Sequence, residues 1–439
     1  MRLEDMVLFS VDDHIVEPPN MYDGRFPSKY ADVAPTHHHG KVGEDDYWTF
    51  GGLKMAYIGA NAVVGRPREE YGFEPSALSQ MRPGCYDVDA RIGDMDVNGV
   101  AASLNFGTMP GMAGEKFLAL PDKDLALIGI KAWNDWHIDD WCGKYPDRLI
   151  PLSNLPFWDP QKSAEEVRRV KSKGCNAISF HPNPVLFGLP SFHTDFWDPI
   201  WKSCVENEVT ICLHFADNSY SFPSPDSPVG VMISNMPIGL YRVASDLVWS
   251  PVLRKFPTIQ FAMSEGGAGW IPYMKQRIDC TFRLHSHWIR QDFGGMQPSE
   301  LFDRNFATCF IDDPVGLKLR HEIGVKNLTW ESDYPHADCI WPNAPEKIWQ
   351  DLVDAQVPDD EIEMITHSNA MRLFHVDLFK LRKREELTVG ALREKAKIAG
   401  VDVTPMQRRG GRPPSESDNG PVSMRDVARQ LAPKDDVAA

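Results

Sequence analysis

Short apolar runs alternate with longer amphipathic stretches along most of the chain. Segments such as 122–142, 162–172 and 196–206 repeat apolar residues at the spacing that buries one face of a helix. Between such segments, eight runs are apolar, often β-branched, and end in polar residues, as the strands of a parallel sheet do. These eight runs are 6–11, 100–106, 149–155, 177–180, 209–213, 259–263, 306–311 and 328–330. The alternation predicts an α/β fold, the (β/α)8 or TIM barrel.

Two connections and the end of the chain do not fit this alternation. Residues from about 15 to 95, after the first strand, are expected to form a cap over the barrel mouth. Residues 215–250, after the fifth strand, begin polar and become apolar, which we interpret as core or subunit interface, with a wall for a bulky substrate as the alternative. From about 382 to 439 the chain is rich in charge, Gly and Pro. We therefore expect a capped barrel over 1–381 and an extended or partly disordered tail over 382–439.

Charge and composition exclude several classes of partner. The chain has 439 residues, with 62 acidic and 46 basic side chains and a net charge of −16, which argues against nucleic acid or an anionic membrane as the main partner. Neither a signal peptide nor an apolar run of about 18 residues is evident, so we expect a cytoplasmic protein. The eight cysteines are scattered singly and are expected to be reduced. The apolar segment after the fifth strand favours a homo-oligomer.

Ionisable side chains follow five of the eight expected strands. Chemistry in such barrels lies at the carboxyl ends of the strands, so these side chains should converge on one mouth. They are Asp12 and His14 after the first strand, His181 after the fourth, His214 after the fifth, Glu265 after the sixth and Asp333 after the eighth. Each alone is more often a structural histidine or a helix cap. Together they predict a metal site, because burying so many charges without a cation is costly.

The first of these segments, VDDHIVEPPN, illustrates the geometry. Alternation along a strand places Asp12 and His14 on one face and turns Asp13 away. Glu17 and His336 are further residues that can orient the ligands. The run His37-His38-His39 is interpreted as part of a cap loop, because adjacent side chains point in different directions.

Three segments carry a family resemblance. SVDDHIVEPP, SEGGAGWIPY and WESDYPH together resemble the amidohydrolase superfamily, in its second sequence branch of metal-dependent hydrolases and decarboxylases, over about residues 7–379. The resemblance implies one metal ion held by Asp12, His14, His214 and Asp333. Two positions depart from it, because Glu265 stands where a histidine is usual and His181 stands where binuclear relatives have a bridging carboxylate. A mixed set of this size suits paired iron or manganese, and zinc remains open.

Within that branch, the pattern resembles a group that includes a non-haem diiron monooxygenase of bacterial diterpenoid biosynthesis. This resemblance implies two iron ions, dioxygen and a bulky apolar substrate carried as a CoA thioester, so hydroxylation is the main expectation. The alternative is a hydrolase or decarboxylase that uses a metal-activated water on one zinc or manganese ion, with Asp333 or a nearby histidine moving the proton. A catalytically inactive scaffold is the third hypothesis.

The remaining candidates complete the expected site. Glu265, Asp333 and His193, which follows the fourth strand, are the expected catalytic residues. The expected substrate-binding residues are Met232 and Met236 after the fifth strand and Arg66 and Arg68 in the cap. The arginines would bind phosphates of CoA, a role that comes from the resemblance alone; solvated surface arginines are the alternative.

Overall fold

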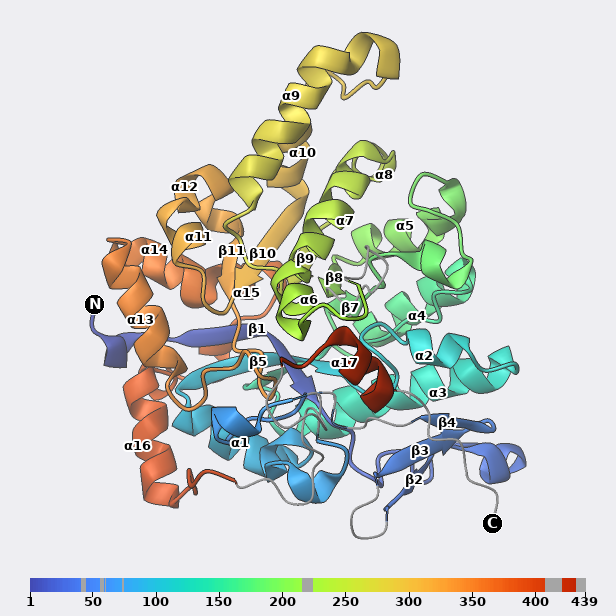
Figure 1. Cartoon of the computed structure of the whole chain (residues 1–439), viewed down its shortest axis with the longest axis vertical. Coiled ribbons are helices and arrows are strands. Elements are labelled where there is room, and N and C mark those ends of the chain that lie inside the picture. Colours follow the sequence, from blue (N-terminus) through green and yellow to red (C-terminus); the bar gives the residue numbers. More distant parts are fainter. Residues whose placement is uncertain are drawn as a thin grey trace.

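The eight expected strands form a closed barrel (Figure 1). The computed structural model describes residues 1–40, 45–55, 59, 61–72, 75–214, 224–406 and 421–431. The barrel strands are β1 (Leu8–Ile15), β5 (Val100–Gly107), β6 (Leu149–Ile150), β7 (Ala177–Ser179), β8 (Thr210–His214), β9 (Phe261–Ser264), β10 (Phe306–Phe310) and β11 (Leu328–Trp330). They pair in parallel in the orders β1-β5-β6 and β11-β10-β9-β8-β7. The predicted (β/α)8 barrel is confirmed.

Two sets of contacts close the gaps between these sheets. Ser153 pairs with Ile178 and so joins the chain after β6 to β7. On the other side, the Asp333 amide donates to the Asp12 carbonyl over 2.9 Å, and the His14 amide donates to the Tyr334 carbonyl over 2.6 Å. These last bonds bring the end of β11 against the end of β1, which places their polar side chains together.

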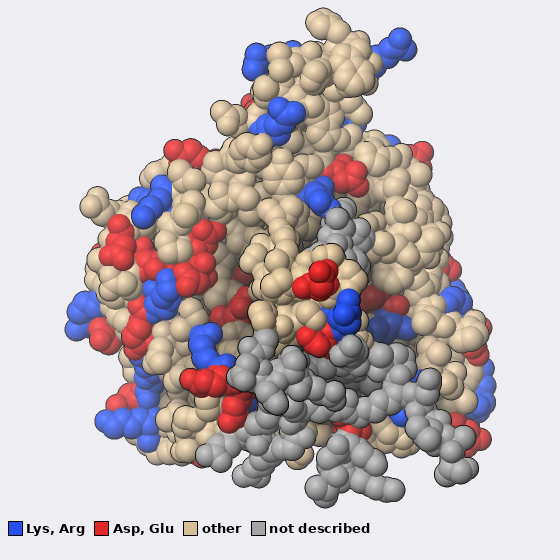
Figure 2. All heavy atoms as spheres, in the orientation of Figure 1, with Lys and Arg blue, Asp and Glu red and all other residues tan. Residues whose placement is uncertain are grey.

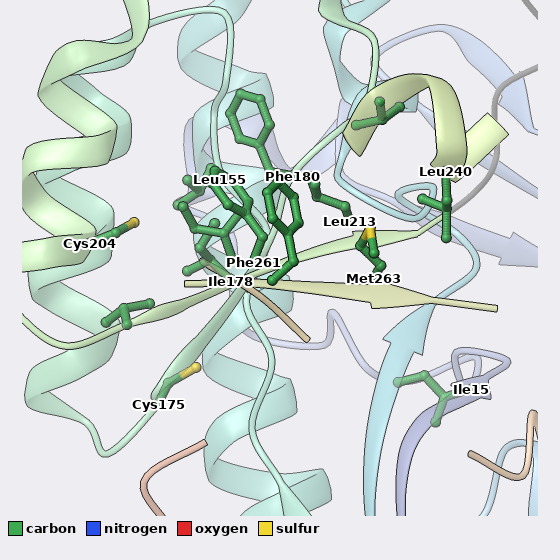
Figure 3. Close-up of a cluster of buried hydrophobic side chains, with 14 of the residues drawn as sticks. Ile15, Leu155, Cys175, Ile178, Phe180, Cys204, Leu213, Leu240, Phe261 and Met263 are labelled. Carbon is green, nitrogen blue, oxygen red and sulfur yellow. The ribbon is translucent and has the colours of Figure 1, made fainter. Parts of the chain in front are cut away.

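Alternation along the strands points small side chains into the barrel and large side chains towards the surrounding helices. Small side chains such as Cys212 and Ala262 pack with Phe9 of β1 inside the barrel. The intervening Leu213, Phe261 and Met263 face the surrounding helices, where Figure 3 shows them near Leu240 and Cys204. The side chains on both faces are buried, so polar residues at the strand ends are conspicuous.

The helices cover the outside of this barrel (Figure 1). They are α1 (Val88–Val97), α2 (Glu115–Leu118), α3 (Lys123–Trp136), α4 (Pro160–Ser172), α5 (Asp198–Glu206), α6 (Val229–Asn235), α7 (Ile238–Trp249), α8 (Val252–Lys255), α9 (Ile271–Ile289), α10 (Pro298–Asn305), α11 (Pro314–Lys318), α12 (Arg320–Ile323), α13 (Ala344–Asp354), α14 (Asp359–Glu363), α15 (Asn369–Leu373), α16 (Val389–Ala399) and α17 (Met424–Leu431). The three helical segments expected from periodicity correspond to α3, α4 and α5. Asp122 and Asp159 cap α3 and α4 by accepting hydrogen bonds from first-turn amides.

The cap contains a small antiparallel sheet at the edge of the molecule (Figure 1). Its strands are β2 (Thr36–His38), β3 (Tyr47–Phe50) and β4 (Leu53–Met55), in the order β2-β3-β4. Gly51 and Gly52, both with positive φ, form the two-residue turn between β3 and β4. The interpretation of His37-His38-His39 as loop is wrong for its first two residues, because pairing with β3 makes them part of a strand.

The segments after β8 and after residue 381 are partly helical. Residues 215–223 lie outside the description, and the apolar part that follows them forms α6 and α7. Residues 389–399, expected in an extended tail, instead form α16, which buries Leu392 and donates from the Val389 amide to the Met6 carbonyl. Val422, just before α17, accepts a hydrogen bond from the Val229 amide at the start of α6.

Two surface features complete the fold. The far end of α9 projects from the barrel and exposes large apolar residues, among them Leu284 and Trp288 (Figure 1). On the face in Figure 2, acidic and basic side chains are interspersed over the body of the molecule, and the charged side chains visible on the projecting end are mostly Lys and Arg. Among the described residues, no helix combines the length and the apolar character needed to cross a membrane.

Candidate metal centre at the barrel mouth

The strand ends bring together six metal-ligand side chains. One group consists of Asp12, His14, His214 and Glu265, and an overlapping group consists of His14, Glu265, Asp333 and His336. Within each group, one donor atom per residue lies within 4.8 Å of the others. Five of the expected ligands and His336, expected to orient them, therefore converge as the sequence predicts.

Imidazole His14 lies at the centre of this arrangement. Its Nε2 atom is 3.3 Å from Asp12 Oδ1, 3.3 Å from Asp333 Oδ1 and 3.3 Å from His214 Nε2. A tetrahedral ion with bonds of about 2.0–2.1 Å separates its ligand atoms by about 3.3–3.4 Å. The spacing around His14 therefore matches that of ligands around one cation.

Glu265 and His336 extend the set on two sides. His214 Nε2 lies 2.9 Å from Glu265 Oε2. His336 Nδ1 lies 2.9 Å from Asp333 Oδ1, and the His336 ring packs against that of His14 with centroids 3.9 Å apart. Glu265 thus presents a carboxylate to the same centre.

Several donor atoms are buried without a hydrogen bond. Within the described part of the chain, this holds for both carboxylate oxygens of Asp12 and both of Asp333. Most buried polar atoms in proteins have a partner, and a buried carboxylate without one is costly. The donor set therefore fits a bound cation, which would occupy the space that these oxygens face.

Burial is the largest cause of the pKa shifts at this centre. Burial, followed by neighbouring carboxylates, raises the pKa values of Asp12 and Asp333 well above the ordinary value. Burial also raises the pKa of Glu265, although His214 partly opposes it. Burial, followed by the charges of His214 and Arg91, lowers the pKa of His336 to about 3. A cation would reverse the shifts of the carboxylates by favouring their charged forms.

Two of these carboxylates belong to residues whose backbone has a positive φ, a conformation that residues other than glycine rarely adopt. Glu265 has φ of 60° and Asp333 has φ of 55°, both in the left-handed region. Hydrogen bonds hold these conformations in place, because the Glu265 amide donates to Glu331 Oε2 over 3.0 Å and the Asp333 amide donates to the Asp12 carbonyl. The backbone is thus held in a shape that aims both carboxylates at the centre.

Glu331 is a site residue that the sequence analysis missed. It is buried, and its Oε2 atom also accepts a hydrogen bond from the Cys309 thiol. Burial is the main cause that raises its pKa from 4.5 to about 8, and the charge of Glu265 adds to it. The signal was present in WESDYPH, where Glu331 precedes Asp333 by two residues.

A cavity of about 560 Å³ adjoins the centre. Carboxylates, an arginine and apolar side chains line it, including Glu265, Glu331, Arg68, Trp270, Phe310 and Ile340. Arg68 therefore lies at the cavity, and its role in substrate binding stays a prediction. The cavity gives a small molecule access to the side of the centre formed by Glu265.

Two histidines of the expected site are not brought into it. His181 is buried, but its Nδ1 accepts a hydrogen bond from the Asn183 amide over 3.0 Å, and it lies outside both ligand groups. His193 lies at the surface, where its Nε2 is 2.7 Å from Asp246 Oδ1 and its side chain is 45 % exposed. Neither position provides a donor to the group around His14.

The other expected residues have varied surroundings. Arg66 is buried and donates to the Gln80 carbonyl over 2.6 Å. This structural position differs from both expectations for Arg66, a residue that binds phosphate and a solvated surface arginine. Met232 in α6 is partly exposed, and Met236, just after α6, packs against the main core.

Glu17 and Asp13 hold β1 against β5. Glu17 accepts hydrogen bonds from the Thr108 and Met109 amides and from the Trp133 indole. Asp13 points away from the centre, as expected, and accepts from the Ser10 and Ser103 hydroxyls and the Tyr334 amide. Both residues thus position the strand that carries Asp12 and His14.

Comparisons with known proteins identify a common family and fold. The family described as Amidohydrolase matches residues 36–376. A 2-amino-3-carboxymuconate-6-semialdehyde decarboxylase from Caenorhabditis elegans is 23% identical over 309 residues, which cover 58% of this chain and 73% of that protein. A gamma-resorcylate decarboxylase from Rhizobium sp. (strain MTP-10005) is 23% identical over 321 residues, which cover 66% and 87%.

Solved structures show the same architecture. An amidohydrolase from Mycobacterium avium subsp. paratuberculosis superimposes with a TM-score of 0.65 and 18% identity, covering 84% of this chain and 99% of that one. A 5-carboxyvanillate decarboxylase from Novosphingobium aromaticivorans, with bound manganese, has a TM-score of 0.57 and 18% identity, covering 86% and 99%.

These comparisons correct the expected chemistry. The relatives are decarboxylases, so the prediction of a diiron monooxygenase that consumes dioxygen is wrong, and the alternative of a metal-dependent hydrolase or decarboxylase is favoured. The error has a physical cause. A mixed set of carboxylates and imidazoles suits manganese or zinc as well as iron, so the donors alone do not specify a redox reaction.

Proposed function

Because the chain belongs to the amidohydrolase family, we propose that it is a metal-dependent decarboxylase of a small aromatic or unsaturated carboxylic acid. The observation that carries the proposal is the set of buried donors at the barrel mouth, with unsatisfied oxygens on Asp12 and Asp333, beside a cavity. The named substrates of the relatives, which are all carboxylic acids, support it.

The metal would be held by Asp12, His14, His214 and Asp333, with Glu265 as a further donor. A bound divalent cation would hold the carboxylate of the substrate and withdraw electron density from the carbon atom to which that carboxylate is attached. We propose manganese, on the basis of its presence in one similar structure. The two groups of donors suffice for one ion or a pair. The expected pair of iron ions differs from this proposal in element and in number, and metal analysis distinguishes the two.

The cavity would bind the rest of the substrate. Trp270, Phe310 and Ile340 offer apolar surface that suits a flat ring or conjugated chain. Arg68 places a guanidinium at the edge of the same cavity, where it can pair with an anionic substituent. A small planar acid therefore fits the composition of this wall.

Decarboxylation also requires a proton. The bond between the carbon and the carboxylate breaks, carbon dioxide leaves, and a proton must reach the electron pair that remains on the carbon. We propose that Asp333 and His336 deliver it, because Asp333 Oδ1 and His336 Nδ1 lie 2.9 Å apart within the donor set. Both side chains are buried, so bulk water does not compete at this position.

The test is release of carbon dioxide by manganese-loaded protein from a panel that includes 2,6-dihydroxybenzoate and 5-carboxyvanillate. Asp333→Asn should reduce the rate by about 10²-fold or more if Asp333 moves the proton. His193→Ala, which alters a surface histidine, is the matched control and should leave the rate unchanged. Metal content per chain is measured on the same samples by mass spectrometry.

Two outcomes would overturn the proposal. One is the absence of carbon dioxide release from every acid in the panel by protein shown to contain metal. The other is hydrolysis of esters or lactones at a higher rate, without carbon dioxide, which would assign the centre to the hydrolase alternative.

A further inference from the structure

The cap carries a second group of metal-ligand side chains, formed by His37, His39 and Asp46. His37 lies in β2 and His39 directly follows it; their rings face each other, and His38 between them points elsewhere. His38 is engaged there, with its Nε2 atom 2.8 Å from the Thr49 hydroxyl. The histidine run thus contributes two side chains, two residues apart, to one place.

The donor atoms of this group are close to the spacing of metal ligands. His37 Nε2 lies 3.8 Å and His39 Nδ1 lies 3.6 Å from Asp46 Oδ2, and the two imidazole rings have centroids 4.7 Å apart. A tetrahedral zinc ion with bonds of about 2.0–2.1 Å separates its ligand atoms by about 3.3–3.4 Å. The two distances to Asp46 would reach that spacing after shifts of a few tenths of an ångström, and all three donor atoms lie within 4.8 Å of one another.

His37 is a polar side chain buried without a hydrogen bond. Its side chain is 2 % exposed and packs against the Trp48 ring, with centroids 5.1 Å apart. Among the described residues, neither ring nitrogen has a hydrogen-bond partner, and 3.8 Å to Asp46 is too long for one. A ligand on Nε2 would satisfy an atom that is otherwise costly to bury.

Asp46 is held in place by the backbone around it. Its Oδ1 atom accepts from the Gly40 amide over 2.9 Å, and its Oδ2 atom accepts from the Leu78 amide over 3.1 Å. Its own amide donates to the Ser76 carbonyl over 2.9 Å. Metal-binding carboxylates are commonly oriented by such hydrogen bonds, which fix the direction of the free lone pairs.

We propose that His37, His39 and Asp46 form a zinc site in the cap, with water as the fourth ligand. Two imidazoles and one carboxylate suit zinc, and the exposure of His39 gives the ion a path from solvent. The ion would tie β2 and His39 to Asp46, which the Leu78 amide holds in place, and so stabilise the cap. The site is separate from the barrel mouth and does not depend on the proposed decarboxylase function.

The test uses the full-length protein, stripped with a chelator and dialysed against zinc. Zinc per chain and zinc affinity are compared for the wild type, His39→Ala and the matched control His38→Ala. Replacing the exposed His39 should leave the fold intact, and His37→Gln is a second variant that alters the buried ligand. The wild type and the control should bind one zinc ion more than His39→Ala or His37→Gln.

The thermal unfolding midpoint provides an independent measurement. Zinc should raise it more in the wild type and in His38→Ala than in His39→Ala, because an ion that binds only the folded cap stabilises it. The zinc-binding affinity of the cap should fall at least about tenfold in both ligand variants. Equal zinc content and affinity in all four proteins would overturn the proposal, as would an equal loss in His38→Ala.

Discussion

Replacing Glu331 by glutamine should stabilise the metal-free protein, and the gain should depend on pH. Burial raises the pKa of Glu331 from 4.5 to about 8. The folded protein therefore keeps the proton over a pH range in which the unfolded chain releases it, and the free energy of unfolding falls as pH rises from about 4.5 to about 8. Glutamine has the same shape and remains neutral, so its oxygen can still accept from the Glu265 amide.

The magnitude follows from 1.36 kcal/mol per pKa unit. At pH 7, which is about 2.5 units above the unfolded-state value, the carboxyl costs about 3 kcal/mol. At pH 5 the cost is about 1 kcal/mol, and above pH 8 it levels off at about 4–5 kcal/mol. The benefit of Glu331→Gln should thus grow by about 2–3 kcal/mol between pH 5 and pH 7.

Urea unfolding in the presence of a chelator, at pH 5, 7 and 8.5, measures this benefit. Glu206→Gln, an exposed glutamate on α5, is the matched control and should change the free energy of unfolding by less than about 0.5 kcal/mol. A difference between Glu331→Gln and wild type that stays constant across the three pH values would refute the assignment of a raised pKa.

Three further predictions concern other parts of the molecule. Asp94→Asn weakens a buried ion pair, in which Arg82 donates to the Asp94 carboxylate over 3.0 and 2.7 Å. It should lower the free energy of unfolding, measured in urea, by about 3–5 kcal/mol, and a loss below about 1 kcal/mol would contradict this. His193→Ala removes a half-exposed pair with Asp246 and should lower that free energy by less than about 1 kcal/mol, so a larger loss would indicate a hidden role. Chelation should lower the thermal unfolding midpoint measured by calorimetry, and manganese should restore it, because a cation that binds only the folded protein stabilises it. An unchanged midpoint would indicate that the site holds no metal.

The barrel could be predicted because each strand is a short apolar run that ends in polar residues. The boundaries were less predictable. The third run was expected to continue to 155, but β6 ends at Ile150 because Pro151 has no amide to donate to a neighbouring strand. The helix α16 was missed because the stretch from 382 to 439 around it is rich in charge, Gly and Pro, although Leu392 and Ala396 give the helix a buried face.

The centre at the barrel mouth could be predicted from Asp12, His14, His214, Glu265 and Asp333 because parallel strands aim their ends at one place. His181 also follows a strand, yet its contact with the Asn183 amide is set by a local turn that no strand pattern reveals. The group in the cap was missed because it depends on the pairing of β2 with β3 and on Asp46, which comes from a separate segment. The reaction could not be read from the donors, because the same ligands serve several metals.

The left-handed backbone at Glu265 and Asp333 lowers the stability of the fold at two residues that the proposed activity requires. Each residue occupies a conformation that glycine adopts freely, at a cost of about 1–3 kcal/mol to other residues. Glycine at either position would relieve that strain and remove a buried negative charge. Selection for stability of the metal-free protein would therefore favour variants that no longer bind the metal, and any directed evolution of a more robust enzyme has to screen turnover at every round.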